Sequence, residues 1–340
     1  MPRRLFALLA AVAMVAGAFG MRHLLDQRKE DKAHPLNLIC VPDLTALCQI
    51  IGQRTDINVT VEPASQTSGR VVALNGALGI DGWLTTGPWP SMAEAGRQAK
   101  GLPRMFTTTS PPVLARTPVV LAVWPDRAAA LRQNCPNQQI GWKCLGSVAG
   151  KRQWKDVPGG NPIWGPVKIA LPDPGNDAAG VTVLGAAAVD YFGRPDVAAA
   201  DFEDDAFRDW VSGLKSTTPT REPTFSEVLA TGKSLEDVYA GLEADVQPAL
   251  AQYARADKPV LLYPAPMTTV DLVLAVLPGR AGQRVRVLVA SAVKDHLADL
   301  GWRLTGGPGR QPALPALGAG GGVPDPGVLD ALRLVWKEAA

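Results

Sequence analysis

Segments with the pattern of β-strands and segments with the pattern of α-helices alternate along most of this chain. Residues 36–41 are apolar enough for a buried strand, and residues 44–51 repeat apolar side chains at helical spacing. Strand patterns return at residues 57–61 and 80–84, with a helical stretch near residues 69–78 between them. Because strands that alternate with helices form sheets covered by helices, we predict an α/β fold.

Three short motifs predict the first turn of a helix. In each, a Ser or Thr is followed three residues later by an acidic residue, so both side chains can bond free amide groups there. The motifs begin at Ser91, Thr224 and Ser234. We therefore expect a helix to begin near each of these residues.

The apolar run at residues 113–124 is too apolar for a surface strand. Pro118 interrupts this run and cannot donate a hydrogen bond within a sheet. We predict that the run crosses between two lobes. Further strands are expected at residues 167–171, 259–263 and 270–277, and helices at residues 178–191 and 285–300.

The last part of the chain changes in composition. Residues 305–327 are rich in Gly and Pro without apolar periodicity, which predicts a flexible linker. A short amphipathic helix follows at residues 328–336. Its apolar face could dock on the protein itself or bind a partner, and it consists of Leu329, Leu332, Val335 and Trp336.

The N-terminus has the pattern of an export signal. Arg3 and Arg4 precede an uncharged, mostly apolar stretch at residues 5–21, and a charged segment follows. Two outcomes stay open: cleavage after the small residues 16–18, or retention as a short membrane anchor with its N-terminus inside the cell. Either outcome places the rest of the chain on the extracytoplasmic side of the membrane.

The four cysteines fall into two close pairs, Cys40 with Cys48 and Cys135 with Cys144. In an exported protein this arrangement predicts two local disulfides, with free buried thiols as the alternative. Neither pair has the spacing of a zinc site, and the three histidines are scattered, so we expect no metal.

Charge and motifs argue against several functions. The 34 basic and 32 acidic residues form no sustained basic stripe, so we expect no nucleic-acid partner. The sequence has neither a nucleophile elbow nor a phosphate-binding loop, and His34 and His296 lie far from any catalytic motif. We therefore expect no enzymatic activity and no cofactor.

Four segments in a fixed order carry a family resemblance. They are residues 116–123, 168–174 with 179–180, 262–266 with 272–277, and 290–303. Together they resemble the type II periplasmic solute-binding proteins, particularly the solute-binding domains that actinobacteria place outside the membrane, sometimes beside a von Willebrand factor A domain. No such second domain follows residue 327 in this sequence.

The resemblance implies two α/β lobes that close on a ligand. Its expected divisions are a signal or anchor with linker at residues 1–35, lobe 1 at 36–116 and 265–305, lobe 2 at 117–264, a linker at 306–327 and a C-terminal helix at 328–340.

The same resemblance implies that three loops and the return crossover face the cleft. Asp43 stands where oxyanion-binding members place a neutral hydroxyl group, which argues against an oxyanion and favours a cation, a polar neutral solute or no small ligand. Asp43 and Asp177 could instead cap helices, and Trp89 and Tyr263 could pack within the protein. The candidate ligand-binding residues are Asp43, Thr45, Thr85, Thr86, Trp89, Asp173, Asn176, Asp177 and Tyr263.

The implied function is therefore capture of a small solute for a membrane permease or a sensor. The alternative is a membrane-tethered interaction module that keeps the fold, has no small ligand and binds another envelope protein. A retained N-terminal helix would attach the protein to the membrane and suit this second role, whereas a free, cleaved protein would suit transport.

Overall fold

The computed structural model describes residues 35–74, 78–108, 110–304 and 323–339. Residues 1–34 of the predicted signal or anchor, and most of the predicted linker, lie outside these ranges. Across the described ranges, no helix combines the length and apolar character needed to cross a membrane.

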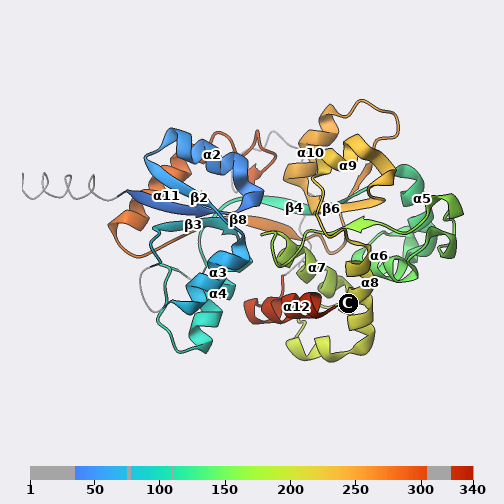
Figure 1. Cartoon of the computed structure of the whole chain (residues 1–340), viewed down its shortest axis with the longest axis horizontal. Coiled ribbons are helices and arrows are strands. Elements are labelled where there is room, and N and C mark those ends of the chain that lie inside the picture. The colour runs from blue at the N-terminus through green and yellow to red at the C-terminus, as the bar shows by residue number, and fades with distance from the viewer. Residues whose placement is uncertain (1–34, 75–77, 109, 305–322, 340) are drawn as a thin grey trace, which may run out of the picture.

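Lobe 1 is built on one end of a mixed sheet in the strand order β2-β1-β3-β8 (Figure 1). Strand β1 runs parallel to β2 and β3, while β8 is antiparallel to β3. The strands are β1 (Leu36–Cys40), β2 (Ile57–Val61), β3 (Gly82–Thr86) and β8 (Thr269–Val276). The helices are α2 (Thr45–Arg54), α3 (Ala64–Ala73), α4 (Pro88–Ala99) and α11 (Arg280–Val293).

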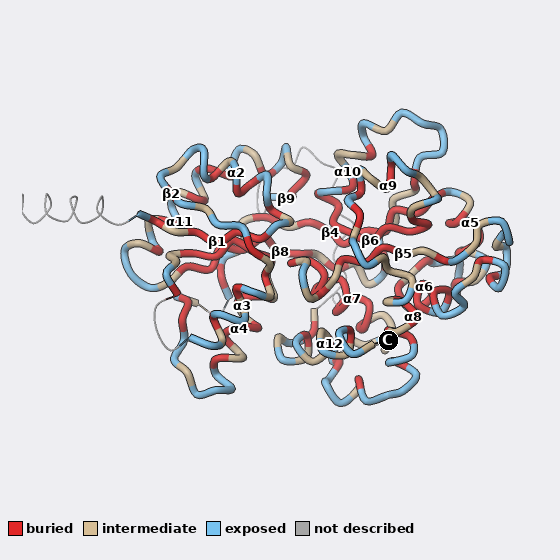
Figure 2. The backbone as a smooth tube through the Cα atoms, viewed as in Figure 1, coloured by how far each residue is buried: buried red, intermediate tan, exposed pale blue. Residues whose placement is uncertain are grey.

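Lobe 2 continues the sheet with β6 beside β4 and β5 beside β6. Its strands are β5 (Ile169–Ala170), β6 (Val238–Leu242) and β7 (Val260–Leu262). Its helices are α5 (Pro125–Asn134), α6 (Trp142–Lys151), α7 (Gly180–Phe192), α8 (Asp205–Thr217), α9 (Phe225–Thr231) and α10 (Glu243–Gln252). Figure 2 shows the buried strands running through the middle of both lobes, with exposed segments around them.

Strand β4 (Val113–Val123) belongs to both lobes. Its first half pairs with β8 and with β9 (Arg303–Leu304), and its second half, from Val119 onward, pairs with β6 and β7. Pro118 lies at the change of partners, where its missing N–H costs the sheet little. The predicted crossing and the two-lobed α/β fold are confirmed. The precise residue limits of the lobes stay a prediction.

Helix α12 (Pro326–Glu338) packs on both lobes. It contacts α4 of lobe 1 and α7 and α8 of lobe 2, and in Figure 1 it lies between the lower parts of the two lobes. Leu329, Leu332 and Trp336 are buried, because the apolar residues of this helix repeat at helical spacing. Gly185 of α7 allows this close approach, since a Cβ atom there would lie 2.8 Å from the Leu329 side chain. Of the two roles predicted for this face, the helix docks on the protein.

The motif at Ser91 does not begin a helix. Helix α4 begins at Pro88, whose fixed φ suits the first helical position, so Ser91 lies inside it. The Glu94 carboxylate instead accepts hydrogen bonds from the backbone amides of Met105 and Phe106. The prediction at Ser91 was therefore wrong by one turn.

The other two motifs had opposite outcomes. Thr224 and Glu227 form the predicted reciprocal pair at the start of α9, with the Glu227 carboxylate accepting from the Thr224 amide at 2.8 Å. The prediction of a helix start at Ser234 was wrong, because strand β6 follows this residue and no α-helix begins there. Asp237 is buried rather than placed in a first helical turn, and its charge is used within lobe 2.

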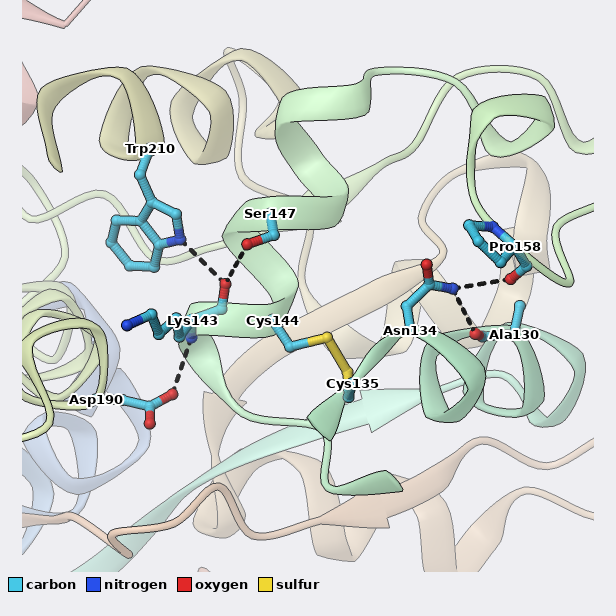
Figure 3. The surroundings of a disulfide bond; sticks show 9 residues. All are labelled: Ala130, Asn134, Cys135, Lys143, Cys144, Ser147, Pro158, Asp190 and Trp210. Carbon is cyan, nitrogen blue, oxygen red and sulfur yellow. Dashed lines mark hydrogen bonds between the residues drawn. A yellow bond between two sulfur atoms is a disulfide. The ribbon is translucent and has the colours of Figure 1, made fainter. Parts of the chain in front are cut away.

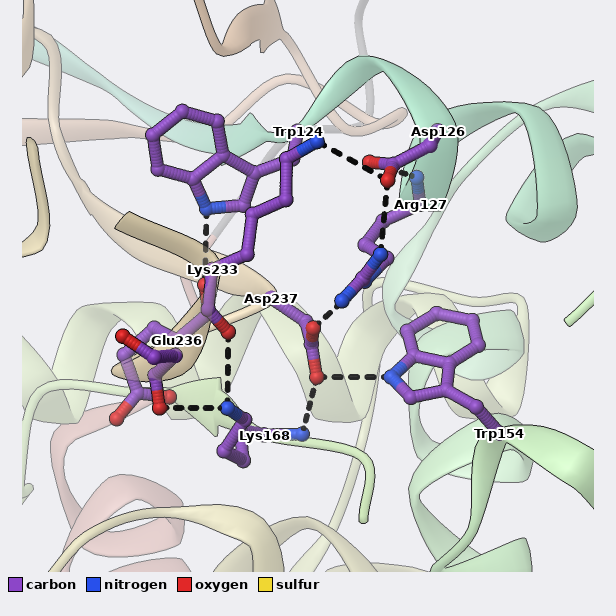
Figure 4. A network of polar contacts seen from close by, with 9 residues as sticks. Trp124, Asp126, Arg127, Trp154, Lys168, Lys233, Glu236 and Asp237 are labelled. Atoms are coloured by element: carbon purple, nitrogen blue, oxygen red, sulfur yellow. Dashed lines mark hydrogen bonds and ion pairs between the residues drawn. The ribbon is translucent and has the colours of Figure 1, made fainter. Parts of the chain in front are cut away.

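A buried polar network centred on Asp237 joins the elements of lobe 2 (Figure 4). Its carboxylate accepts from Arg127 Nε at 2.7 Å, from Trp154 Nε1 at 2.8 Å and from the Lys168 amide at 2.9 Å. The Arg127 guanidinium also lies 3.9 Å from the Trp164 ring centre. Because the buried charge is paired and hydrogen-bonded, the network holds α5, β5 and β6 together.

Both predicted disulfides are present. Cys40–Cys48 ties the end of β1 to α2, and Cys135–Cys144 ties the end of α5 to α6 (Figure 3). The alternative of free thiols was wrong, because the chain contains no free cysteine.

Candidate functional site

The backbone of one residue of lobe 2, Ala178, is held by three side chains of lobe 1. Thr86 Oγ1 donates to the Ala178 carbonyl at 2.6 Å, and Trp89 Nε1 donates to the same oxygen at 2.8 Å. The Ala178 amide donates to Asp43 Oδ2 at 2.6 Å. The end of β3, the start of α4 and the loop after β1 therefore meet the loop before α7, so the two lobes are in direct contact at this point.

The chain's own carboxylates occupy the start of α7. Asp177 Oδ1 accepts from the amides of Ala179 at 2.7 Å and Gly180 at 2.9 Å, so Asp177 caps this helix. Asp43 accepts from the preceding amide, although it belongs to the other lobe. Because free amides at a helix start are what bind an anion, these contacts leave little there for an oxyanion ligand.

Four carboxyl groups gather around this point, and we call them the acidic cluster: Asp43, Asp177, Glu222 and Asp245. Burial raises the pKa of Asp43, and burial with the Asp43 and Glu222 charges raises that of Asp177 well above its usual range. Burial and neighbouring carboxylates raise the pKa of Glu222 to about 7. Asp245 is exposed to solvent on one side, yet the surrounding protein and the Asp43 charge raise its pKa to about 7.

Tyr239 of β6 lies near enough to the acidic cluster for the charges of the cluster to act on its phenol. Its ring lies over Gly241, where a Cβ atom would come within 2.6 Å of it. Burial and the charges of all four carboxylates of the cluster raise the pKa of Tyr239 well above its usual value.

A cavity of about 210 Å³ opens beside the acidic cluster between α2 and α10. Asp43 and Asp245 line it from opposite lobes, and Asp299 and Trp302 lie on its wall. Its other lining residues are Leu44, Ala46, Leu47, Ala244, Pro248 and Leu300. A larger hollow of about 680 Å³ lies in lobe 2 near Cys144, away from this cleft. We favour the smaller cavity as the site because both lobes build it.

Four of the predicted ligand-binding residues use their polar groups locally or not at all. Thr45 Oγ1 donates to the Pro42 carbonyl, and Asp173 accepts from the Gly175 amide and from Asn176 Nδ2. The buried Thr85 hydroxyl has no hydrogen-bond partner in the described part of the chain. Their role in binding stays a prediction.

Trp89 and Tyr263, the two aromatic residues predicted to contact a ligand, form hydrogen bonds with other residues of the protein. Trp89 does not lie in a loop, as was expected, but in the first turn of α4, where it is 1% exposed and bonds Ala178. Tyr263 follows β7, and its hydroxyl donates to Glu243 Oε2 at 2.5 Å. Arg303 also pairs with Glu243, so Tyr263 belongs to a polar group beside the crossovers.

Sequence reasoning missed Tyr239, Glu222 and Asp245. Tyr239 lies in an apolar strand pattern that predicts core, and Glu222 lies in a loop without a motif. Asp245 could have been predicted from its position, because it lies in the first turn of a helix that directly follows a strand. Asp43 has a similar position, since it lies between strand β1 and helix α2. Within the described ranges, no group of three or more His, Cys, Asp or Glu residues could hold a metal ion.

Two α/β lobes joined by crossover strands, with a cavity between them, match the fold of the type II periplasmic solute-binding proteins. No protein-family model and no curated protein matches this sequence.

Solved structures with this fold match nearly the whole chain. The iron-bound HitA of Pseudomonas aeruginosa is 15% identical, with 90% of this chain and 100% of that chain covered and a TM-score of 0.58. The periplasmic binding protein AfuA of Actinobacillus pleuropneumoniae is 15% identical, with 89% and 96% covered and a TM-score of 0.57. A periplasmic thiamin binding protein is 10% identical, with 89% and 95% covered and a TM-score of 0.53.

Proposed function

We propose that this protein captures a small solute between its two lobes on the extracytoplasmic side of the membrane and passes it to a transporter or sensor. The observation that carries the proposal is the cavity between α2 and α10, which both lobes build beside their contact at Ala178. Movement of one lobe about the crossovers would open or close this cavity.

Similar structures support a binding role rather than an enzymatic one. AfuA was solved with fructose-6-phosphate, HitA with iron, and the third similar protein binds thiamin. Since these ligands differ in charge and size, the shared fold supports capture without fixing the ligand. The finer likeness to actinobacterial domains, with their von Willebrand factor A partners, rests on the sequence segments alone.

Export is supported by the two disulfides, which persist in oxidising compartments. We propose that the apolar N-terminal segment directs export and attaches the protein to the membrane, where a permease or another envelope protein would be its partner.

Thermal denaturation with a panel of solutes tests capture. Anions, amines, amino acids, sugars and metal salts are added to the protein, and a ligand at 100 times its Kd should stabilise the fold by about 2.7 kcal/mol. The Asp245→Asn variant, altered on the wall of the cavity, should lose part of this gain. Stabilisation of both proteins to the same extent by every active solute would contradict binding at the cleft.

An interaction module is the second candidate, and two contacts favour it. The lobes bond each other directly at Ala178, and α12 packs on both of them. Cross-linking in cells that express the full chain tests this role. A defined envelope partner, together with no response to any solute of the panel, would favour the module over capture.

A further inference from the structure

We propose that the chain holds a second binding site, for a small uncharged molecule with an apolar body and one hydroxyl or amide group. The site is a cavity of about 290 Å³ between α4, α7 and α12, where the hydroxyl group of Thr182 bonds the polar group of the ligand. Among the described residues, this cavity shares none of its lining with the cavity between α2 and α10. The inference therefore goes beyond the proposed capture of a solute.

Four parts of the chain meet at this second cavity. Pro88 at the start of α4 lines it from lobe 1, and Thr182 of α7 lines it from lobe 2. Val273 of β8 and Leu329 of α12 belong to its other walls. In Figure 1, α4, α7 and α12 lie below the crossover strands, whereas α2 and α10 lie above them. A ligand in this cavity would therefore contact both lobes on the side of the crossovers where α12 packs.

The Thr182 side chain faces the cavity and is almost wholly buried. Thr182 is 1% exposed, and its hydroxyl has no hydrogen-bond partner in the described part of the chain. Gly185 lies three residues later on the same face of α7, and this face packs against Pro324 and Leu329 of the cavity wall. Because buried polar groups are nearly always hydrogen-bonded, the unpaired hydroxyl indicates a partner from outside the described chain.

Contact between the lobes explains why the Thr182 hydroxyl is unpaired. Within a helix, a Thr hydroxyl can donate to the carbonyl four residues earlier, which for Thr182 is the carbonyl of Ala178. That oxygen already accepts from Thr86 and Trp89 of lobe 1, so both of its lone pairs are used. Closure of the lobes therefore occupies the local acceptor of Thr182 and leaves its hydroxyl for a ligand.

The lining of the cavity favours an uncharged ligand. Asp271 is the only ionisable residue among the described residues of the wall, and its carboxylate accepts from Arg116 Nε at 2.8 Å. An ionised ligand would therefore lose water without meeting an unpaired opposite charge. Most of the wall is apolar, including Pro88, Val273 and Leu329, which suits a ring or a short alkyl chain. Since an apolar cavity of about 150 Å³ holds benzene, this cavity has room for a substituted ring.

Titration of the full chain with benzyl alcohol, followed through its backbone amide NMR signals, tests the proposal. Toluene lacks the hydroxyl group of this probe, while benzylamine and benzoate carry a positive and a negative charge on the same ring. We expect benzyl alcohol to shift the amide signals of Thr182 and Gly185. It should bind roughly 2- to 12-fold more tightly than toluene, the gain from one neutral hydrogen bond, and more tightly than either ion.

Three variants assign the hydrogen bond. Thr182→Val keeps the shape of the side chain and removes the hydroxyl, so the affinity for benzyl alcohol should fall to that for toluene. Thr86 lies outside the cavity wall, but Thr86→Val frees a lone pair of the Ala178 carbonyl for Thr182. This variant should weaken the binding of benzyl alcohol roughly 2- to 12-fold and leave that of toluene unchanged. Thr60→Val is the matched control, because Thr60 is exposed on β2, and it should leave both affinities unchanged.

Each other result overturns a defined part of the proposal. Equal affinities of the unaltered protein for benzyl alcohol and toluene would refute a role for the Thr182 hydroxyl. Tightest binding of benzylamine or benzoate would refute an uncharged ligand, and an affinity that Thr86→Val does not change would refute the link to closure. Unshifted signals of Thr182 and Gly185 with every probe would refute the site itself. The solute panel reports separately on the cavity that Asp245 lines.

Discussion

The contact at Ala178 predicts that a single methyl-for-hydroxyl exchange will loosen the cleft. In Thr86→Val the side chain keeps its shape and loses the hydroxyl group that donates to the Ala178 carbonyl at 2.6 Å. Trp89 still donates to that oxygen at 2.8 Å, so the carbonyl is not left unpaired. The change therefore removes one interlobe hydrogen bond without exposing a buried acceptor.

The expected effect of Thr86→Val on the opening of the lobes follows from the kind of hydrogen bond that is lost. A neutral hydrogen bond contributes about 0.5–1.5 kcal/mol net, and the larger cost of an unsatisfied buried group does not apply here. Since 1.4 kcal/mol is a factor of ten, the ratio of open to closed protein should rise roughly 2- to 12-fold. Thr60→Val is the matched control, because Thr60 is exposed on β2 of lobe 1.

Hydrogen exchange at the Ala178 amide measures this ratio. The amide donates to Asp43 across the cleft and exchanges only when that contact opens. In Thr86→Val it should exchange faster by the same 2- to 12-fold, while amides in the centre of β6 and the Thr60→Val protein stay unchanged. An unaltered Ala178 rate in a folded Thr86→Val protein would refute the assignment of this contact to the closed cleft.

Three further predictions follow from burial, charge and cross-links. Leu332→Ala should lower the free energy of unfolding by about 2–5 kcal/mol in urea denaturation, whereas Leu334→Ala, on the exposed side of α12, should change it little. The raised pKa of Glu222 stabilises the free protein at low pH, so its contribution should be lost as the pH rises from about 4.5 to 7, and Glu222→Gln should flatten that part of the pH profile. Replacement of both Cys135 and Cys144 by Ser should cost about 2–3 kcal/mol, and a cost near zero in the same denaturation assay would show that the bridge constrains nothing.

Local sequence patterns predicted the architecture well where packing and propensity agree. The apolar run across Pro118 identified β4 because buried strands of this kind are apolar on both faces. The reciprocal pair at Thr224 and Glu227 works over three residues and needs no tertiary information. The same motif gave a wrong prediction at Ser234. There the acidic residue of the motif, Asp237, is buried against Arg127, and this tertiary contact overrides the local preference for a helix start.

The site was only partly predictable, because its chemistry comes from residues far apart in the sequence. Asp43 was singled out for its charge, but its partner, the Ala178 amide, lies 135 residues away. Tyr239 looks like any aromatic residue of a core strand until the carboxylates around it are known. Loop residues such as Glu222 acquire their shifted pKa only from neighbours that the fold supplies.

The position of α12 has a consequence for how the lobes move. A bilobed protein whose halves meet only at a hinge can sample a continuous range of angles, but this helix seals its apolar side chains against both halves. To open fully, the protein must either slide α12 along one surface or peel it away, and close packing makes partial separation unfavourable. We therefore expect two discrete conformations, one closed and one open. The rate of exchange between them should depend on how often α12 dissociates from one of the lobes.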